Sequence, residues 1–231
     1  MLIYIGLDDT DNHESRGTGR LAREIATDLA RDYIVLGVTR HQLLVDSLIP
    51  YTSHNSSAAI MIEAPGSLPI ESIFERIRRL MLEDFVPGSD PGLCVTTESV
   101  AQELTGFGIR AQQEVLDQAE ARLLAESAGA LLTGLGGSQD GVIGALAAVG
   151  LAAGGQDGRY LLLGNSRDLT GLQPLEALRT LGLEDIRTLD GNSVETGFVL
   201  ADKLRPARRA GRPVLFVEQS GQHYWLPIKL G

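Results

Sequence analysis

The chain opens with Leu2-Ile3-Tyr4-Ile5-Gly6-Leu7, an apolar run that ends abruptly in Asp8-Asp9-Thr10-Asp11. A short run of apolar, β-branched and aromatic residues predicts a buried strand. Three carboxylates in four positions at the end of such a strand have two interpretations. Either they cap the strand and turn the chain, or they hold a metal ion.

A glycine-containing turn after this acidic cluster favours the metal. Gly17-Thr18-Gly19 precedes residues 19–33, where apolar side chains recur at the spacing of one helix face. The start of a helix offers unpaired backbone N–H groups to a phosphate, and carboxylates bind Mg²⁺. The pattern therefore predicts a site for a Mg²⁺-bound phosphate. Its candidate metal-binding residues are Asp8, Asp9 and Asp11, and its candidate phosphate-binding residues are Thr10, Gly17, Thr18 and Gly19.

Thr18 has three possible roles. A threonine at this position is typical of a helix N-cap. Its hydroxyl could also contact a phosphate or accept a phosphoryl group, and its position alone favours the N-cap.

Composition excludes several classes of protein. The chain has 231 residues with 43% hydrophobic content, which is enough for one large or two small domains. It has no apolar run of membrane-spanning length and no signal-peptide pattern, so we expect a cytoplasmic protein. A single cysteine, Cys94, rules out a disulfide framework, and a net charge of −10 disfavours general nucleic-acid binding.

Strand and helix patterns alternate along the chain and predict an α/β or α+β fold. A domain boundary is expected within residues 106–112. Strands are expected at 2–7, 34–38, 58–62, 93–97, 130–132, 160–163 and 214–217, and helices at 19–33, 70–81, 112–128, 142–153 and 172–181.

A second glycine-rich loop spans residues 134–141, between an expected strand and an expected helix. It matches neither the dinucleotide-binding fingerprint nor the P-loop, because the third glycine and the Lys-Ser/Thr pair are missing. Two interpretations stay open, an anion cradle and a tight turn that lets the small-residue helix pack closely. The nucleotide-binding candidates here are Gly136, Gly137, Ser138, Asp140 and Gly141.

Two further segments carry polar candidates. The loop over residues 50–57 offers Ser53, His54 and Asn55 as substrate contacts, although isolated loop histidines are commonly solvated. The segment 205–212 carries four arginines, which favour a solvated surface over a phosphate or RNA contact.

Taken in order, these motifs resemble those of the archaeal tRNA-isoleucine agmatidine synthetases. That family has a strand ending in Gly-Ile-Asp-Asp-Thr-Asp, similar to residues 6–11 here, and then a threonine-containing turn. The similarity runs from residue 1 to about 218. Its other elements are Ile49-Pro50-Tyr51 with the strand after it, Asp90-Pro91-Gly92, the helix at Gly141-Val142-Ile143-Gly144-Ala145-Leu146-Ala147-Ala148, and Pro213-Val214-Leu215-Phe216.

The resemblance implies a kinase-like ATP-binding domain over residues 1–110 and a ferredoxin-like domain with a C-terminal extension over 111–231. The family uses ATP and Mg²⁺ to activate the C2 oxygen of the wobble cytidine, which agmatine then displaces. The resemblance also implies a catalytic role for four residues: Asp8, Asp9 and Asp11 bind metal and phosphates, and Thr18 takes part in phosphoryl transfer.

The family also has an OB-fold and a zinc ribbon that hold the tRNA. This chain ends at Gly231 with one cysteine, so we expect those parts to be missing.

The sequence therefore predicts an ATP- and Mg²⁺-dependent phosphoryl-transfer or ligase-type enzyme acting on a small molecule or an RNA. The alternative is a non-catalytic nucleotide-binding regulatory module, or a subunit of a larger complex whose partner supplies the RNA contacts. Under either hypothesis the expected protein partner is a second copy of the chain or another protein.

Overall fold

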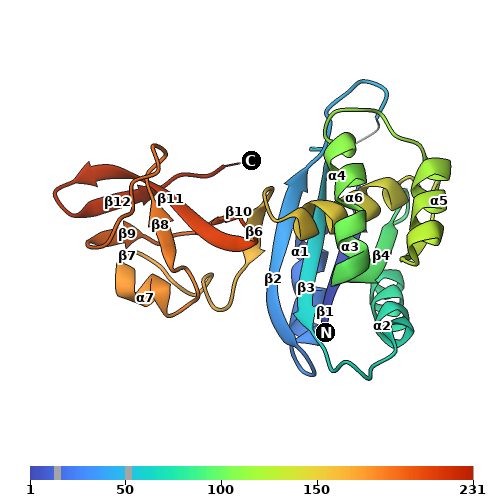
Figure 1. Ribbon diagram of the computed structural model, residues 1–231, viewed down its shortest axis with the longest axis horizontal. Helices are drawn as coiled ribbons and strands as arrows, with labels where there is room; N and C mark the ends of the chain where they lie inside the picture. Colours follow the sequence, from blue (N-terminus) through green and yellow to red (C-terminus); the bar gives the residue numbers. More distant parts are fainter. Residues whose placement is uncertain (13–16, 50–53, 231) are drawn as a thin grey trace.

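The computed structural model describes residues 1–12, 17–49 and 54–230. Figure 1 shows a large lobe, in which helices cover both faces of a sheet, and a smaller lobe built mainly from short strands. The chain completes the large lobe before it enters the smaller one. The α+β class expected from the sequence is confirmed.

The centre of the large lobe is a four-stranded antiparallel sheet in the order β4-β1-β3-β2. Helix α1 connects β1 to β2, and helix α2 connects β3 to β4, which gives the βαββαβ order of a split βαβ motif. The elements are β1 (Leu2–Asp8), α1 (Thr18–Leu29), β2 (Ile34–Gln42), β3 (Ser56–Glu63), α2 (Ile70–Glu83) and β4 (Gly92–Thr97).

Both faces of this sheet are buried, because alternate residues of each strand point to opposite sides. On β1, Ile3, Ile5 and Leu7 pack with α1 and α2, whereas Tyr4 belongs to the core on the other face. That second core is covered by α3 (Glu98–Glu103), α4 (Thr105–Ala111), α5 (Gln118–Ala128) and α6 (Gly141–Gly154). A strand buried on both faces explains why residues 2–7 are continuously apolar.

Helix α6 lies at the centre of this second layer (Figure 1). It contains no polar side chain and is buried along nearly its whole length. It packs against β1 and β4 on one side and against α3, α4 and α5 on the other. A helix with an apolar surface all round requires such a position.

Segments on both sides of residue 110 share this sheet and core. β5 (Leu131–Gly134) pairs with β4, and β6 (Arg159–Leu162) pairs with β2, so each extends one edge of the sheet. This does not match the boundary expected at residues 110 and 111. The split βαβ motif also lies in the first hundred residues, whereas a ferredoxin-like domain was expected after residue 111. The reason is that long-range strand pairing, which leaves no local pattern, decides which segments share a sheet.

The smaller lobe follows β6. A single residue pair, Ala207 with Arg159, joins its strand β10 to β6 of the large lobe. Its elements are β7 (Leu172–Pro174), α7 (Leu175–Arg179), β8 (Asp185–Arg187), β9 (Phe198–Leu200), β10 (Ala207–Arg209), β11 (Arg212–Gly221) and β12 (Tyr224–Pro227).

Several expected elements need correction. The helix expected at 172–181 is divided into β7 and α7, because Leu172 to Pro174 pairs with β9 and Pro174 precedes the helix. The helix expected at 112–128 begins at Gln118, after α4 has already ended at Ala111. The N-cap of α1 is Gly17 rather than Thr18. No helix in the described ranges is long and apolar enough to cross a membrane.

Candidate functional site

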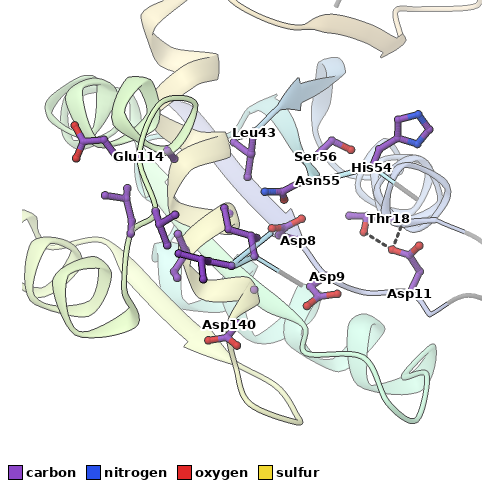
Figure 2. Close-up of a pocket in the computed structure, with 18 residues that line it drawn as sticks. Asp8, Asp9, Asp11, Thr18, Leu43, His54, Asn55, Ser56, Glu114 and Asp140 are labelled. Carbon is purple, nitrogen blue, oxygen red and sulfur yellow. Dashed lines mark hydrogen bonds between the residues drawn. The ribbon is translucent and has the colours of Figure 1, made fainter. Parts of the chain in front are cut away.

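The acidic cluster lies where β1 ends against the start of α6. Asp8 is the last residue of the strand, and Asp9 follows in the left-handed region with φ of 50°. Asp is one of the few non-glycine residues that tolerate this region. Figure 2 shows Asp8, Asp9 and Asp140 around one cavity, with Asp11 and Thr18 beside them.

Glycines allow α6 to come this close to the acidic cluster. A Cβ atom on Gly144 would lie 1.7 Å from the Asp8 carboxylate, and one on Gly141 would lie 3.0 Å from the Asp8 carbonyl oxygen. The first turn of α6, the positive end of its dipole, therefore faces the Asp8 carboxylate. Packing thus selects small residues at the start of this helix.

The cavity at this junction has a volume of about 180 Å³. One wall is polar and includes Asp8, Asp9, Asp11, Thr18 and Asp140. The opposite wall is mainly apolar, with a single carboxylate at Glu114. Its apolar residues are Leu43, Leu48, Ile49, Ala111, Val115, Leu116 and Ile143. A concave site with a polar side and an apolar side is typical of a small-molecule pocket.

The carboxylates of the cavity repel one another. Burial, and then the charges of Asp9 and Asp11, raise the pKa of Asp8 to about 8, against a backbone hydrogen bond from Asp9. Burial, followed by the charges of Asp90, Asp11 and Asp140, raises the pKa of Asp9 to about 6. Both shifts have the same physical cause, anionic groups gathered in a partly desolvated space.

Thr18 is held by hydrogen bonds to two residues of the acidic segment. Its Oγ1 donates to Asp11 Oδ1 at 3.0 Å, and its backbone N–H donates to the same oxygen at 3.3 Å. The Oγ1 atom also accepts hydrogen bonds from the hydroxyl and the backbone N–H of Thr10, at 3.1 and 3.4 Å. Asp11 thus satisfies the first N–H group of α1, the task that the sequence assigned to Thr18.

Thr10 itself is buried and does not line the cavity. It contributes to the site through its hydrogen bonds to Thr18. Gly17 and Gly19 line a neighbouring groove that meets the cavity at Thr18 and Asp11.

The second glycine loop contributes only its end to the cavity. Asp140 and Gly141 line it, whereas Gly136, Gly137 and Ser138 do not. The backbone N–H of Ser138 donates to Asp90, and the Asp140 carboxylate accepts bonds from the Ser138 hydroxyl at 2.7 Å and from Gln118 at 2.6 Å. The Ser138 amide is therefore occupied by a carboxylate of the protein.

The predicted substrate loop is placed in part. His54 is exposed and lines both the cavity and the groove. Asn55 lines the cavity, while its side-chain amide donates to the Leu44 carbonyl at 2.6 Å. Ser53 lies outside the described residues.

Sequence reasoning missed Ser56, Glu114 and Gly144, which also line the cavity. Ser56 belongs to the polar loop over residues 50–57, and Gly144 to the small-residue run of α6, so both left a signal in the sequence. Glu114 lies in a segment without a recognisable motif.

The residues present fit a magnesium ion. Within the described ranges, no three carboxylate, imidazole or thiol groups lie close enough to hold a metal ion by themselves. Magnesium commonly takes only one or two carboxylates, completing its shell with water and substrate phosphates. The two neighbouring carboxylates, Asp8 and Asp9, supply such a pair, and a cation between them would relieve their repulsion.

Comparisons with known proteins find similarity among solved structures. No protein-family model and no curated protein matches the chain. A solved tRNA fluorescent labeling enzyme matches with a TM-score of 0.58 and 26% identity, over 65% of this chain and 36% of that one. The agmatidine synthetase TiaS, solved with its tRNA and ATP, gives the same four values. This chain resembles an agmatidine synthetase.

The same synthetase solved with AMPCPP and agmatine matches with a TM-score of 0.57 and 25% identity, over 65% of this chain and 36% of that one. The resemblance expected from the sequence is thus confirmed. The chain spans about a third of the length of the agmatidine synthetase structures that it matches.

Proposed function

We propose that this chain is an enzyme of RNA modification related to the agmatidine synthetases, using ATP and Mg²⁺ to activate an oxygen atom of an RNA or small-molecule acceptor. The matched synthetase was solved with tRNA and ATP, which supports a nucleotide and an RNA as ligands. Phosphoryl transfer depends mostly on positioning of the reacting groups and on neutralisation of the phosphate charge. The cavity contains carboxylates that suit a metal ion and a hydroxyl that suits contact with the phosphate.

One observation carries the proposal. Asp8 and Asp9 meet the first turn of α6 in the same cavity that holds the Thr18–Asp11 hydrogen bond. Metal-binding oxygens, the positive end of a helix and a hydroxyl with a carboxylate acceptor are thus combined in one cavity. This combination supports binding of a nucleoside triphosphate and transfer of its terminal phosphoryl group.

Each residue has a definite role in this proposal. Asp8 and Asp9 hold Mg²⁺ or its water ligands, and the bound ion neutralises the phosphate charge. Thr18 contacts the transferred group or accepts it. If Thr18 accepts, its Oγ1 forms a bond to the terminal phosphorus, the bond to the ADP oxygen breaks, and the hydroxyl proton passes to Asp11 Oδ1.

Titration calorimetry with ATP and Mg²⁺ tests the nucleotide site. Asp9→Asn should abolish Mg²⁺-dependent ATP binding, because it removes one of the paired carboxylates. Glu75→Gln removes the same charge from the exposed face of α2 and should leave binding unchanged. Equal affinity of Asp9→Asn and the parent protein would overturn the metal-site assignment.

ATP turnover tests whether the protein is an enzyme. We expect ADP release that depends on Mg²⁺ when a panel of RNAs and amines is supplied as acceptors. Stoichiometric ATP binding without turnover across the whole panel would instead establish a non-catalytic nucleotide-binding module.

A further inference from the structure

A second concave surface adjoins the cavity on the far side of Thr18. This basic groove has a volume of about 310 Å³, and its lining includes Gly19, Arg20, Arg23, Arg40, Ser56 and Leu161. It shares Asp11, Thr18, His54 and Ser56 with the cavity. A ligand lying across Thr18 would therefore touch both spaces.

The charge of the groove is opposite to that of the cavity. Arg23 lies on α1 and Arg40 on β2, and both side chains are partly buried. Within the described ranges, neither arginine forms an ion pair with a carboxylate. In a chain with a net charge of −10, two such cations on one concave surface form a local exception.

Further cations surround these two. Burial, followed by the charges of Arg167 and Arg205, lowers the pKa of Arg23. Arg167 donates at 3.3 Å to the carbonyl of Leu161, a residue of the groove lining. The pKa of Lys229 is lowered by Arg159, then by burial, and then by Arg40 and Arg205. These residues come from segments far apart in the sequence, so the fold itself gathers the positive charge. Such a cluster is unfavourable unless an anion neutralises it.

Neighbouring groups fix the orientation of Arg23 and Arg40. Arg23 donates to the Gly19 carbonyl at 2.6 Å, and Arg40 Nε donates to Ser56 Oγ at 2.8 Å. Helix α1, twelve residues long, begins at the same groove with its positive end. Planar guanidinium groups beside a helix start suit the tetrahedral oxygens of a phosphate.

We propose that the basic groove binds a phosphate group of the acceptor, separately from the metal-bound phosphates of the nucleotide. The acceptor is then a phosphate-bearing molecule, anchored in the groove with its reactive oxygen directed past Thr18 into the cavity. This inference rests on the proposed function, which supplies the nucleotide as the ligand of the neighbouring cavity. The separation of basic groove and acidic cavity gives each phosphate its own site.

Inorganic phosphate in Mg²⁺-free buffer is a direct probe of the groove. Nitrogen-15 NMR of the arginine Nε–H groups should show Arg23 and Arg40 shifting together as phosphate is added, with sodium chloride at equal ionic strength as the salt control. Arg23→Gln and Arg40→Gln should each weaken phosphate binding about tenfold, because each removes a charge-assisted hydrogen bond.

Two variants serve as controls. Arg31→Gln removes an exposed cation just after α1 and should leave phosphate binding unchanged. Arg40→Lys retains the charge and should recover part of the affinity, which separates loss of charge from loss of folding. Phosphate affinity unchanged in both glutamine variants would overturn the proposal.

Binding of ATP with Mg²⁺ to the same variants distinguishes the two sources of phosphate. We expect the nucleotide affinity of Arg23→Gln and Arg40→Gln to stay within about twofold of the parent. A nucleotide affinity that falls as far as the phosphate affinity would assign the groove to ATP and overturn the acceptor site. Asp9→Asn should keep phosphate binding, so failure of the nucleotide proposal would be visible separately.

Discussion

Thr18 Oγ1 donates a hydrogen bond of 3.0 Å to Asp11 Oδ1, at the point where the acidic cavity meets the basic groove. The same carboxylate oxygen accepts the first backbone N–H of α1. Asp11 therefore stabilises the helix start and orients the hydroxyl at once. A substitution at Asp11 would therefore disturb both the helix start and the hydroxyl, whereas one at Thr18 removes the hydroxyl and keeps the N–H bond to Asp11.

Replacing Thr18 should impair phosphoryl transfer more than folding. Thr18→Val keeps the shape and removes the hydroxyl that contacts or accepts the phosphoryl group, so we expect ATP turnover to fall about 100-fold or more, the range for loss of one group that stabilises the transition state. Thr18→Ser keeps the hydroxyl and should retain most of the activity. ADP release measures turnover, and calorimetry should show nucleotide affinity within a few-fold. Equal turnover in Thr18→Val and the parent would exclude a role for the hydroxyl.

The raised pKa values of Asp8 and Asp9 predict how stability depends on pH. In the unfolded chain both carboxyls ionise near pH 4. In the folded protein the pKa of Asp8 is about 8 and that of Asp9 about 6. Between pH 4 and pH 8 the folded state therefore binds more protons than the unfolded state. The free energy of unfolding of the metal-free protein should therefore fall as pH rises from about 4 to about 8.

Asp8→Asn isolates this effect. The variant should show a shallower fall in melting temperature over that interval, because the buried group no longer ionises. Mg²⁺ at one fixed concentration should stabilise the parent more at pH 8 than at pH 6, since the ligands must lose their protons. Parallel pH curves for variant and parent would contradict the prediction.

Gly144 is expected to be essential to the position of Asp8. Gly144→Ala places a methyl group where the Asp8 carboxylate lies, 1.7 Å away, so either α6 or Asp8 must move. We expect a loss of about 1–3 kcal/mol of stability together with weaker Mg²⁺-dependent ATP binding.

Gly106→Ala is the matched control in α4. A Cβ atom there meets nothing within 4 Å, so alanine should stabilise the protein by about 0.5–1 kcal/mol and leave nucleotide binding intact. Denaturant unfolding measures both variants. A stable, fully binding Gly144→Ala protein would show that the close approach is not needed.

Arg208 should be a structural residue, unlike the other arginines of its segment. It is buried, and its guanidinium donates to Ala152 O in α6 at 2.9 Å, to Tyr160 Oη at 2.8 Å and to Gly211 O at 2.7 Å. Arg208→Met leaves these acceptors without a donor and should cost about 1–3 kcal/mol. Arg212→Met, at an exposed position four residues on, should change little. Similar melting temperatures for the two variants would refute this distinction.

The four arginines of residues 205–212 also show why sequence interpretation is incomplete. Their spacing favoured a solvated surface, yet Arg208 is buried against α6 and Arg205 belongs to the cations around the basic groove. A charge run specifies polarity but not the neighbours of each side chain. Those neighbours come from β6, α6 and the loop after β6, which lie far away in the chain.

The sequence by itself determined the local elements that carry the site. The apolar run before Asp8 predicted β1, the spacing after Gly17 predicted α1, and the polar residues between them marked the candidate site. These features follow from periodicity and side-chain chemistry within a few residues. The likeness to agmatidine synthetases was visible for the same reason, because ordered local motifs carry it.

Only the tertiary structure decided how these elements meet. Packing of α6 brings Asp140 and Gly144 to Asp8, and pairing of β5 and β6 with the first sheet places the two halves of the chain in one lobe. The cations around the basic groove likewise come from distant segments. The physical reason is that burial patterns specify which face of an element is covered, whereas long-range packing decides what covers it.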